Sequence, residues 1–282
     1  MRIIIVNVAI FIIARIAGII FMLFNSHIDT LLQWLQLPSN PQQLLHRPWT
    51  LFSYMFLQYD IAHILFNMLW LYWLGRIFVE FFTQKQLFGL YVLGGLGGAI
   101  LYVVMYNVFP YYAGVNSFLL GASASVMAIV VATAMYSPNY KINLLFLGAI
   151  SLKWIAAFVV FIDILQIDST NSGGHIAHLG GAVVGAIYTT LYRRGTDITS
   201  GFNRIFDSTH NMFSKLGDIS FTRKSIKKVK HNKEYKKTKP DTTSPTAEAE
   251  MDIILEKIKR SGYSSLTTDE KKRLFNASNK LN

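Results

Sequence analysis

Six stretches of this chain are apolar for long enough to cross a lipid bilayer, and this feature constrains the fold more than any other. A transmembrane helix needs about 20 consecutive, mainly apolar residues. The first run continues to Phe24, which is too long for a cleaved signal peptide, so we expect it to be a retained helix. The sequence predicts an all-α membrane protein whose six transmembrane helices lie at approximately 3–24, 60–81, 87–108, 119–137, 152–168 and 174–192.

Charge divides the chain into an apolar body and a basic tail. Residues 1–192 contain seven Lys or Arg and five Asp or Glu, whereas most of the net charge of +11 lies in the last 90 residues. We therefore expect a membrane domain at 1–194, a basic and partly amphipathic linker at 195–248, and a small helical hairpin at 249–282. The chain has no cysteine, which excludes disulfides, thiolate metal sites and a cysteine nucleophile.

The distribution of Lys and Arg predicts the orientation of the six helices. If the N-terminus lies in the cytoplasm, the expected outer segments are 25–59, 109–118 and 169–173. Arg47 is the only Lys or Arg in these three segments. Positive charges collect on the cytoplasmic side of membrane proteins. We expect a multi-pass protein of a bacterial inner (plasma) membrane with both termini in the cytoplasm.

Three polar clusters interrupt the apolar runs, and each lies at the start of an expected helix. In this topology the second, fourth and sixth helices all enter from the outer face, so the three clusters lie at one depth and predict one shared site. The clusters are His63 with Asn67, Ser123 with Ser125, and His175 with His178.

Small residues around two of these clusters predict a close contact between helices. Gly181 and Gly185 form a small-x-x-x-small pattern that lets another helix backbone approach. Such a contact with the fourth helix would bring Ser123 within hydrogen-bond reach of His178. A serine becomes a useful nucleophile when a base takes its proton, and imidazole titrates in the right range.

The remaining roles of an acyl-transfer site can also be assigned. His63, the Asn67 amide and the Ser123 backbone N–H are available to stabilise an oxyanion. The nearest carboxylates in sequence are Asp163 and Asp168, and neither is expected near the clusters. The prediction is a Ser–His dyad in which packing orients the histidine.

Each residue also has a plainer interpretation. Ser123 could be a helix-packing serine, and His63 or Asn67 could make an interhelical hydrogen bond. The His175–His178 pair could bind a metal, but a third ligand is needed and His63 is the only candidate, so neither a metal nor a cofactor is expected. Ser125 is a rival nucleophile about 200° around the helix from Ser123, and His175 is the rival of His178.

The motifs resemble those of rhomboid-family intramembrane serine proteases over roughly residues 46–192. The resemblance begins at HRPWTLFSYMFLQYDIAHILFNMLWLYWLG, continues through GGLGG at 94–98 and ends at AHLGGAVVG. The positions that match the family patterns are, in chain order, His63 and Asn67, Gly121 and Ser123, and Ala177, His178, Gly181 and Gly185.

The resemblance implies a six-helix rhomboid-like bundle that cleaves transmembrane segments of substrate proteins. It implies that Ser123 is the nucleophile and His178 the general base. It also implies that His63, Asn67 and Gly121 bind the oxyanion or the substrate.

The chain departs from the family pattern at two positions. Ala124 stands where the family usually has glycine. Its added methyl group is expected to tighten the oxyanion pocket without closing it. Met127 stands where members often carry an aromatic ring against the histidine, and methionine can also pack on imidazole.

Three functions are compatible with these features, and proteolysis is preferred. The alternative is a catalytically inactive rhomboid-like protein that binds and escorts membrane proteins, although both Ser123 and His178 are present. A small transporter would need charged residues near the middle of several spans, and only Arg15 approaches this. The expected partners are single-span membrane protein substrates and the lipid bilayer.

The tail carries two further signals. Residues 223–239 are rich in Lys and Arg and are expected either to attract anionic lipid headgroups or to form a solvated, flexible linker; nucleic acid is not expected as a partner. Residues 240–248 read as a disordered linker. Beyond them, an apolar helical face at 251–258 and a capping box from Thr267 to Glu270 predict the helical hairpin.

Overall fold

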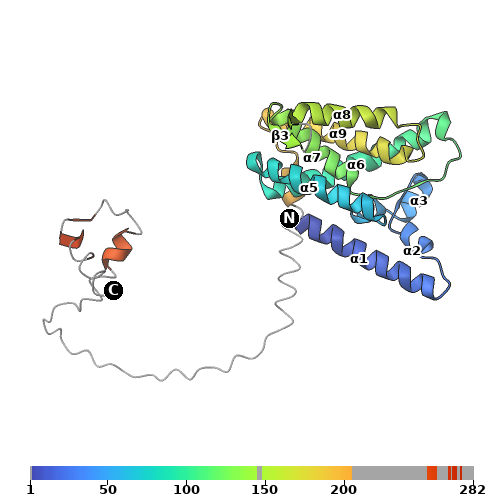
Figure 1. Cartoon of the computed structure of the whole chain (residues 1–282), viewed down its shortest axis with the longest axis horizontal. Helices are drawn as coiled ribbons and strands as arrows, with labels where there is room; N and C mark the ends of the chain where they lie inside the picture. Colours follow the sequence, from blue (N-terminus) through green and yellow to red (C-terminus); the bar gives the residue numbers. More distant parts are fainter. Residues whose placement is uncertain are drawn as a thin grey trace, which may run out of the picture. The chain divides into compact units, whose positions relative to one another are not determined.

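The computed structural model of the chain describes residues 2–144, 148–204, 253–258, 266–267, 269–271 and 274. The chain divides into two units, Met1–Thr222 and Arg223–Asn282, and the long helices belong to the first (Figure 1). Its elements are, in order, α1 (Arg2–Leu23), α2 (Asp29–Gln33), β1 (Leu37–Pro38), α3 (Pro41–His46), α4 (Thr50–Ser53), the 3-10 helix η1 (Tyr54–Phe56), α5 (Ile61–Phe81), α6 (Gln84–Val108), the 3-10 helix η2 (Pro110–Tyr112), β2 (Phe118–Leu119), α7 (Ser123–Tyr136), β3 (Lys141–Leu144), β4 (Gly148–Ser151), α8 (Leu152–Leu165) and α9 (Ser172–Arg193).

Three helices among the described residues, α1, α5 and α6, are both long and apolar enough to span a membrane. The expected spans at 119–137 and 152–168 correspond to α7 and α8, which contain 14 residues each and are shorter than predicted. The last expected span corresponds to α9, which contains 22 residues. The described fold is therefore mainly helical, and a count of six spans stays a prediction.

Helix α7 begins later than the sequence predicts because the residues before it pair with another part of the chain. Strand β2 pairs antiparallel with β1, with Leu119 opposite Leu37. Gly121 then adopts a φ of +128°, which favours glycine, and its backbone N–H donates to the carbonyl oxygen of Tyr54 at 2.9 Å. The turn ends at Ser123, which becomes the first residue of α7.

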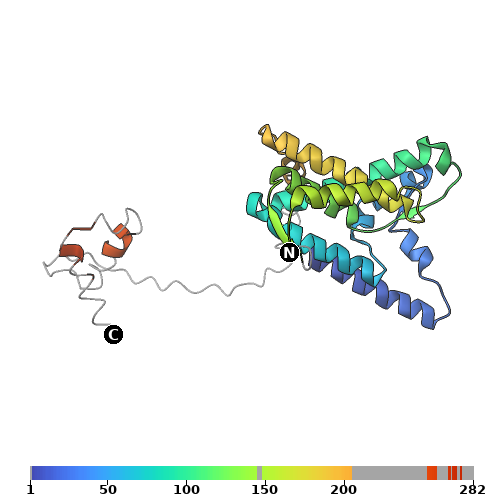
Figure 2. The same ribbon diagram turned by 45° about the horizontal axis from the view of Figure 1, so that its top comes forward.

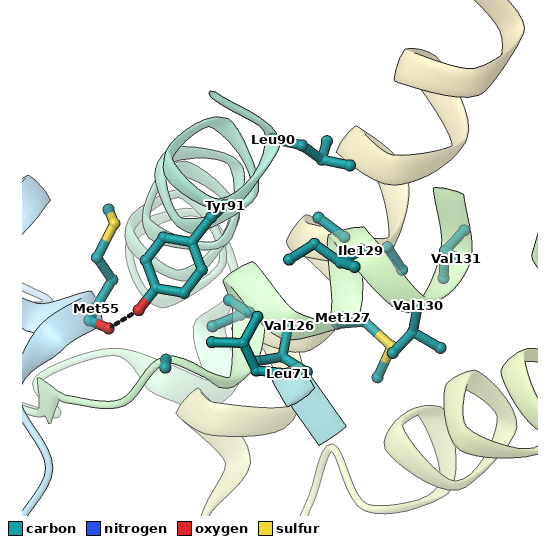
Figure 3. Close-up of a cluster of buried hydrophobic side chains, with 14 of the residues drawn as sticks. Met55, Leu71, Leu90, Tyr91, Val126, Met127, Ile129, Val130 and Val131 are labelled. Carbon is teal, nitrogen blue, oxygen red and sulfur yellow. Dashed lines mark hydrogen bonds between the residues drawn. The ribbon is translucent and has the colours of Figure 1, made fainter. Parts of the chain in front are cut away.

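Helix α7 lies at the centre of the first unit and contacts α5, α6, α8 and α9 (Figures 1 and 2). Every residue from Ala124 to Ala134 is buried. Its Val126, Met127 and Ile129 belong to the same buried cluster as Leu90 and Tyr91 of α6 (Figure 3). The core is thus built around a helix with almost no exposed face.

The closest approach in this core is between α7 and α9. A Cβ atom added at Gly181 would overlap the backbone carbonyl oxygen of Ala124, and one added at Gly185 would overlap that of Ala128. The two backbones therefore touch without a side chain between them, which is the function of small residues at helix interfaces.

The apolar segment between α7 and α8 contains a short β-hairpin. Strands β3 and β4 pair antiparallel, with Lys141 opposite Ser151 and Ile142 opposite Ile150. The pairing satisfies backbone N–H and C=O groups that an irregular segment would leave to solvent or lipid. The all-α expectation is correct for the long elements but misses this hairpin and the β1–β2 pair.

The second unit contains two short described helical segments. Residues 253–258 are helical, as are residues 269–271. The predicted capping box is confirmed: the Thr267 N–H donates to Glu270 Oε2 at 2.7 Å, and the Glu270 N–H donates to Thr267 Oγ1 at 3.3 Å. The basic run at 223–239 and the linker at 240–248 lie outside the described residues.

Substitution of Gly181 by Ala is expected to destabilise the first unit, because its Cβ has no space against Ala124 of α7. The matched control is Gly201→Ala, since nothing lies within 4 Å of a Cβ at that helical glycine. Overpacking of a close contact costs about 1–3 kcal/mol, so G181A should melt below G201A in thermal unfolding of the detergent-solubilised protein. Equal melting temperatures would contradict the close α7–α9 contact.

The pKa of Glu270 is lowered to about 2 by hydrogen bonds from Lys257 and from the Thr267 backbone N–H. Because the folded pKa lies below the ordinary value of 4.5, the stabilising contribution is complete above about pH 4.5 and is lost as the pH falls through 2. A carboxyl NMR titration of the glutamate-labelled chain should show Glu270 titrating below the other glutamates. A Glu270 midpoint near 4.5, unchanged by Lys257→Met, would contradict the contact.

Candidate active site

One cavity brings the three predicted polar clusters together. It has a volume of about 370 Å³ and is lined by His63 and Asn67 of α5, Ser123 of α7 and His178 of α9. The N-terminal parts of three helices far apart in sequence therefore meet at a common site. The rest of the lining is largely apolar and includes Phe66, Trp70, Val126, Val130, Phe158, Val159 and Ile162.

Ser123 is placed by the turn that precedes α7. A Cβ at Gly121 would lie 2.9 Å from His63 Cε1 and 3.7 Å from Ser123 Oγ, so the glycine, the histidine and the serine meet at one point. As the first helical residue, Ser123 has a backbone N–H without a partner inside the helix. That N–H and His63 lie where they could stabilise negative charge near Ser123.

His178 is placed by the contact between α7 and α9. It lies one turn before Gly181, the residue that touches Ala124, and its side chain lines the same cavity as Ser123. No hydrogen bond joins Ser123 to His178 among the residues that the structure describes. The two residues share the cavity, and a catalytic contact between them requires a further approach.

A carboxylate lies beside His178, contrary to the expectation from the sequence. Asp163 Oδ1 is 2.8 Å from His178 Nδ1, and Asp163 is only 4% exposed. The expectation that packing alone orients His178 is wrong. The physical reason is that α8 lies beside α9 (Figure 1) and residues 166–171 reverse the chain between them, so Asp163 and His178 meet across the turn. The sequence signal that could have identified the pair was their position near the two ends of the short connection at 166–171.

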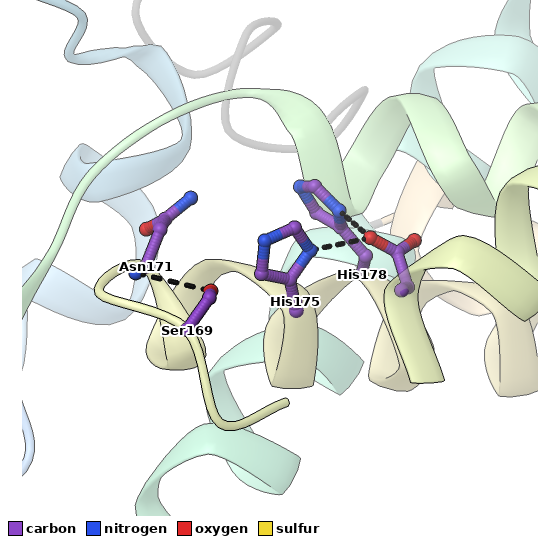
Figure 4. Close-up of polar contacts among 5 residues, drawn as sticks. Ser169, Asn171, His175 and His178 are labelled. Carbon is purple, nitrogen blue, oxygen red and sulfur yellow. Dashed lines mark hydrogen bonds and ion pairs between the residues drawn. The ribbon is translucent and has the colours of Figure 1, made fainter. Parts of the chain in front are cut away.

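The same carboxylate oxygen also contacts His175. Asp163 Oδ1 is 2.7 Å from His175 Nδ1, and both imidazoles face it in Figure 4. The potential ligand atoms of Asp163, His175 and His178 all lie within 4.8 Å of one another. The expectation that His63 is the only third ligand for a metal is therefore wrong.

The rival serine points elsewhere. Ser125 is fully buried, and its Oγ would lie 2.8 Å from a Cβ at Gly95 of α6. Ser125 thus faces α6, whereas Ser123 lines the cavity. This agrees with the angular separation expected for residues two positions apart on a helix.

A family model described as the Rhomboid domain matches residues 45–195, the segment that forms this cavity. The chain belongs to the rhomboid family. Similar proteins include RHOMBOID-like protein 12, mitochondrial, from Arabidopsis thaliana, which is 31% identical over 203 residues, covering 68% of this chain and 57% of that protein. Rhomboid protease GlpG from Pectobacterium atrosepticum is 24% identical over 188 residues, covering 66% of this chain and 60% of that protein.

A third relative is presenilin-associated rhomboid-like protein A, mitochondrial, from Danio rerio, which is 31% identical over 137 residues, covering 47% of this chain and 34% of that protein. The chain thus spans about 60% or less of the length of these relatives. Family membership and the three apolar helices make it an integral membrane protein. A family of unknown function (DUF6576) matches residues 245–280, over the predicted hairpin.

Within the rhomboid domain, a buried polar network holds Asn67. The Asn67 amide donates to Gln58 Oε1 at 2.9 Å, and Gln58 Nε2 donates to Asn7 Oδ1 of α1 at 3.1 Å. Asn7 Nδ2 in turn donates to the Tyr91 hydroxyl at 3.1 Å. One of the two amide hydrogens of Asn67 is therefore committed to Gln58, and Asn67 also lines the cavity. The sequence signal for this network was Asn7, an amide in an otherwise apolar run.

Substitution of Gln58 by Leu should destabilise the rhomboid domain, because it leaves the buried amides of Asn7 and Asn67 without these partners. An unpaired buried polar group costs about 1–3 kcal/mol. The control is Gln42→Leu on the exposed surface. Q58L should lower the melting temperature in detergent more than Q42L does, and equal effects would show that the network contributes nothing.

Proposed function

We propose that this chain is an intramembrane serine endopeptidase that cleaves transmembrane segments of membrane proteins. The observation that supports this most strongly is the shared cavity, in which Ser123 and His178 from two touching helices meet His63 and Asn67. Every role that acyl transfer requires has a residue available in this cavity.

His178 would act as the general base through Nε2. An ionised carboxylate only accepts hydrogen bonds, so the contact with Asp163 Oδ1 fixes the proton of His178 on Nδ1. The lone pair then lies on Nε2, which can take the proton of Ser123 as its oxygen attacks the scissile carbonyl. Asp163 also stabilises the imidazolium that forms. Catalytic hydrogen bonds are often long without substrate and shorten when it binds, which provides the approach that Ser123 and His178 require.

The oxyanion would be stabilised by donors that surround Ser123. The Ser123 backbone N–H, His63 and the remaining Asn67 hydrogen are the available donors. His178 would then protonate the leaving amine and, in the second half of the reaction, activate the water that hydrolyses the acyl-enzyme. The His178 side chain is 20% exposed, so it is accessible to this water.

The proposal extends to substrate and topology. The apolar lining of the cavity fits single-span segments whose helix unwinds near its outer end, because an extended backbone must be presented to Ser123. On the basis of the Lys and Arg distribution, we place six helices across the membrane with both termini in the cytoplasm. A bacterial plasma membrane remains part of the proposal. The relatives include mitochondrial and bacterial proteins, so the comparisons do not distinguish a mitochondrial from a bacterial membrane.

The second candidate function is an inactive rhomboid that binds membrane proteins and escorts them. The observation in its favour is that Ser123 and His178 share a cavity without a hydrogen bond between them. Cleavage assays separate the two functions directly.

The purified chain, reconstituted with a panel of single-span reporter proteins, is expected to cleave at least one of them. Ser123→Ala and His178→Ala should each abolish cleavage, because one removes the nucleophile and the other the base. Ser125→Ala is the matched control and should retain cleavage, since Ser125 faces α6. Gel analysis of the reporter fragments measures the outcome.

Two results would contradict this assignment. Cleavage that survives in S123A but is lost in S125A would show that Ser125, and not Ser123, is the nucleophile. Reporter binding by the wild type, with no cleavage of any reporter, would favour the escort function.

Asp163→Asn is expected to lower kcat by about 10²–10⁴-fold, because an amide holds the tautomer less well and cannot stabilise the imidazolium. The control is Asp168→Asn, an exposed residue near the same helix end, which should keep kcat near that of the wild type. Full activity in D163N, with an unchanged melting temperature, would show that Asp163 does not orient His178.

A further inference from the structure

Three potential metal ligands converge at the proposed catalytic cavity, which two of them, Asp163 and His178, line. They are Asp163 of α8 with His175 and His178 of α9, and their ligand atoms lie within 4.8 Å of one another. The two histidines are three positions apart on one helix and therefore share a face. Both present Nδ1, at 2.7 and 2.8 Å, to the same carboxylate (Figure 4).

The bonding of Asp163 is uneven, and this is a second observation that points to a cation. Oδ1 accepts from both histidines, whereas Oδ2 is buried and has no hydrogen-bond partner among the residues that the structure describes. A buried carboxylate oxygen without a partner is costly. A cation held beside the carboxylate would satisfy it.

The third observation is His175 itself. The proposed reaction needs one imidazole, and Asp163 orients it through His178. His175 adds a second imidazole on the same oxygen without a part in the chemistry at Ser123. Two imidazoles and one carboxylate form a donor set typical of zinc, with the fourth position taken by water.

We propose that Asp163, His175 and His178 bind a divalent transition metal ion of the Zn²⁺ type, and that the bound ion switches off the base. Small side-chain shifts would open the Nδ1-to-carboxylate contacts and admit the ion between them. The side chains of His175 and His178 are 13% and 20% exposed, so an ion and its water ligand can reach them. Binding of the ion does not depend on the proposed proteolysis, although the two share His178 and Asp163; only the inhibitory effect rests on that function.

The inhibition follows from the two nitrogens of His178. When Nδ1 coordinates the metal, the imidazole proton resides on Nε2, and the hydrogen bond from Nδ1 to Asp163 is replaced by a metal–nitrogen bond. A neutral histidine exchanges one tautomer for the other without a net change in protons. Nε2 is then a donor and cannot accept the proton of Ser123.

The first arm of the test measures binding alone. The full chain in detergent is titrated with Zn²⁺ against a chromophoric chelator, and Co²⁺ absorption reports the geometry of the site. Wild type should bind one ion tightly, and His175→Asn should bind at least 10-fold more weakly, because loss of even an outer partner of a metal ligand costs about 10–100-fold. His175→Asn keeps a donor for Asp163, so it should remain folded.

The matched control is His46→Ala, an exposed histidine on α3, which should leave zinc binding unchanged. Equal zinc affinity in the wild type and H175N would overturn the proposal. Loss of the ion in His63→Ala together with its retention in H175N would also overturn it, because the metal would then lie between His63 and His178.

The second arm measures reporter cleavage with and without Zn²⁺. Zinc should inhibit the wild type, and H175N should continue to cleave at the same zinc concentration. Tight binding without inhibition would overturn the inhibitory half of the proposal. If the wild type cleaves nothing, the proposed function fails while the binding arm still decides the metal site.

Discussion

The arrangement of the rhomboid domain depends on the direct contact between the backbones of α7 and α9. Gly181 and Gly185 lie on the carbonyl groups of Ala124 and Ala128 without a side chain between them. In lipid, apolar burial does little to hold helices together, so close van der Waals contact of this kind supplies much of the attraction. Ser123 lies next to Ala124, and His178 lies one turn before Gly181. The same contact therefore brings Ser123 and His178 to one cavity.

The sequence was most informative where chemistry and packing coincide. Three polar clusters in apolar runs identified the cavity residues, because a polar group in such a run needs a partner and the topology put all three at one depth. The capping box at Thr267 could also be predicted, since it depends only on local spacing. The two-residue strands β1 and β2, which delay the start of α7, could not be predicted from the sequence. They lie about 80 positions apart and are too short to show an alternation of apolar and polar residues.

The acid beside His178 shows the limit of local reasoning. Asp163 looks like one more residue near the end of an apolar helix, and its role depends on how α8 packs on α9. The network from Asn67 through Gln58 to Asn7 has the same character, since it links three segments that only the fold brings together. A sequence pattern can say that such groups need partners, but the tertiary contacts decide which partners they find. At Asp163 the result is a single carboxylate oxygen shared by two histidines, one for the proposed reaction and one for the proposed metal site.

The catalytic assignment of Ser123 and His178 is tested most directly by an experimental structure of the chain after reaction with a serine-directed fluorophosphonate. We predict phosphorus bonded to Ser123 Oγ, with its anionic oxygen among His63, Asn67 and the Ser123 N–H. His178 should face the adduct, with its Nδ1 still on Asp163. An adduct on Ser125, or one on Ser123 with His178 beyond hydrogen-bond reach of its oxygen atoms, would contradict it.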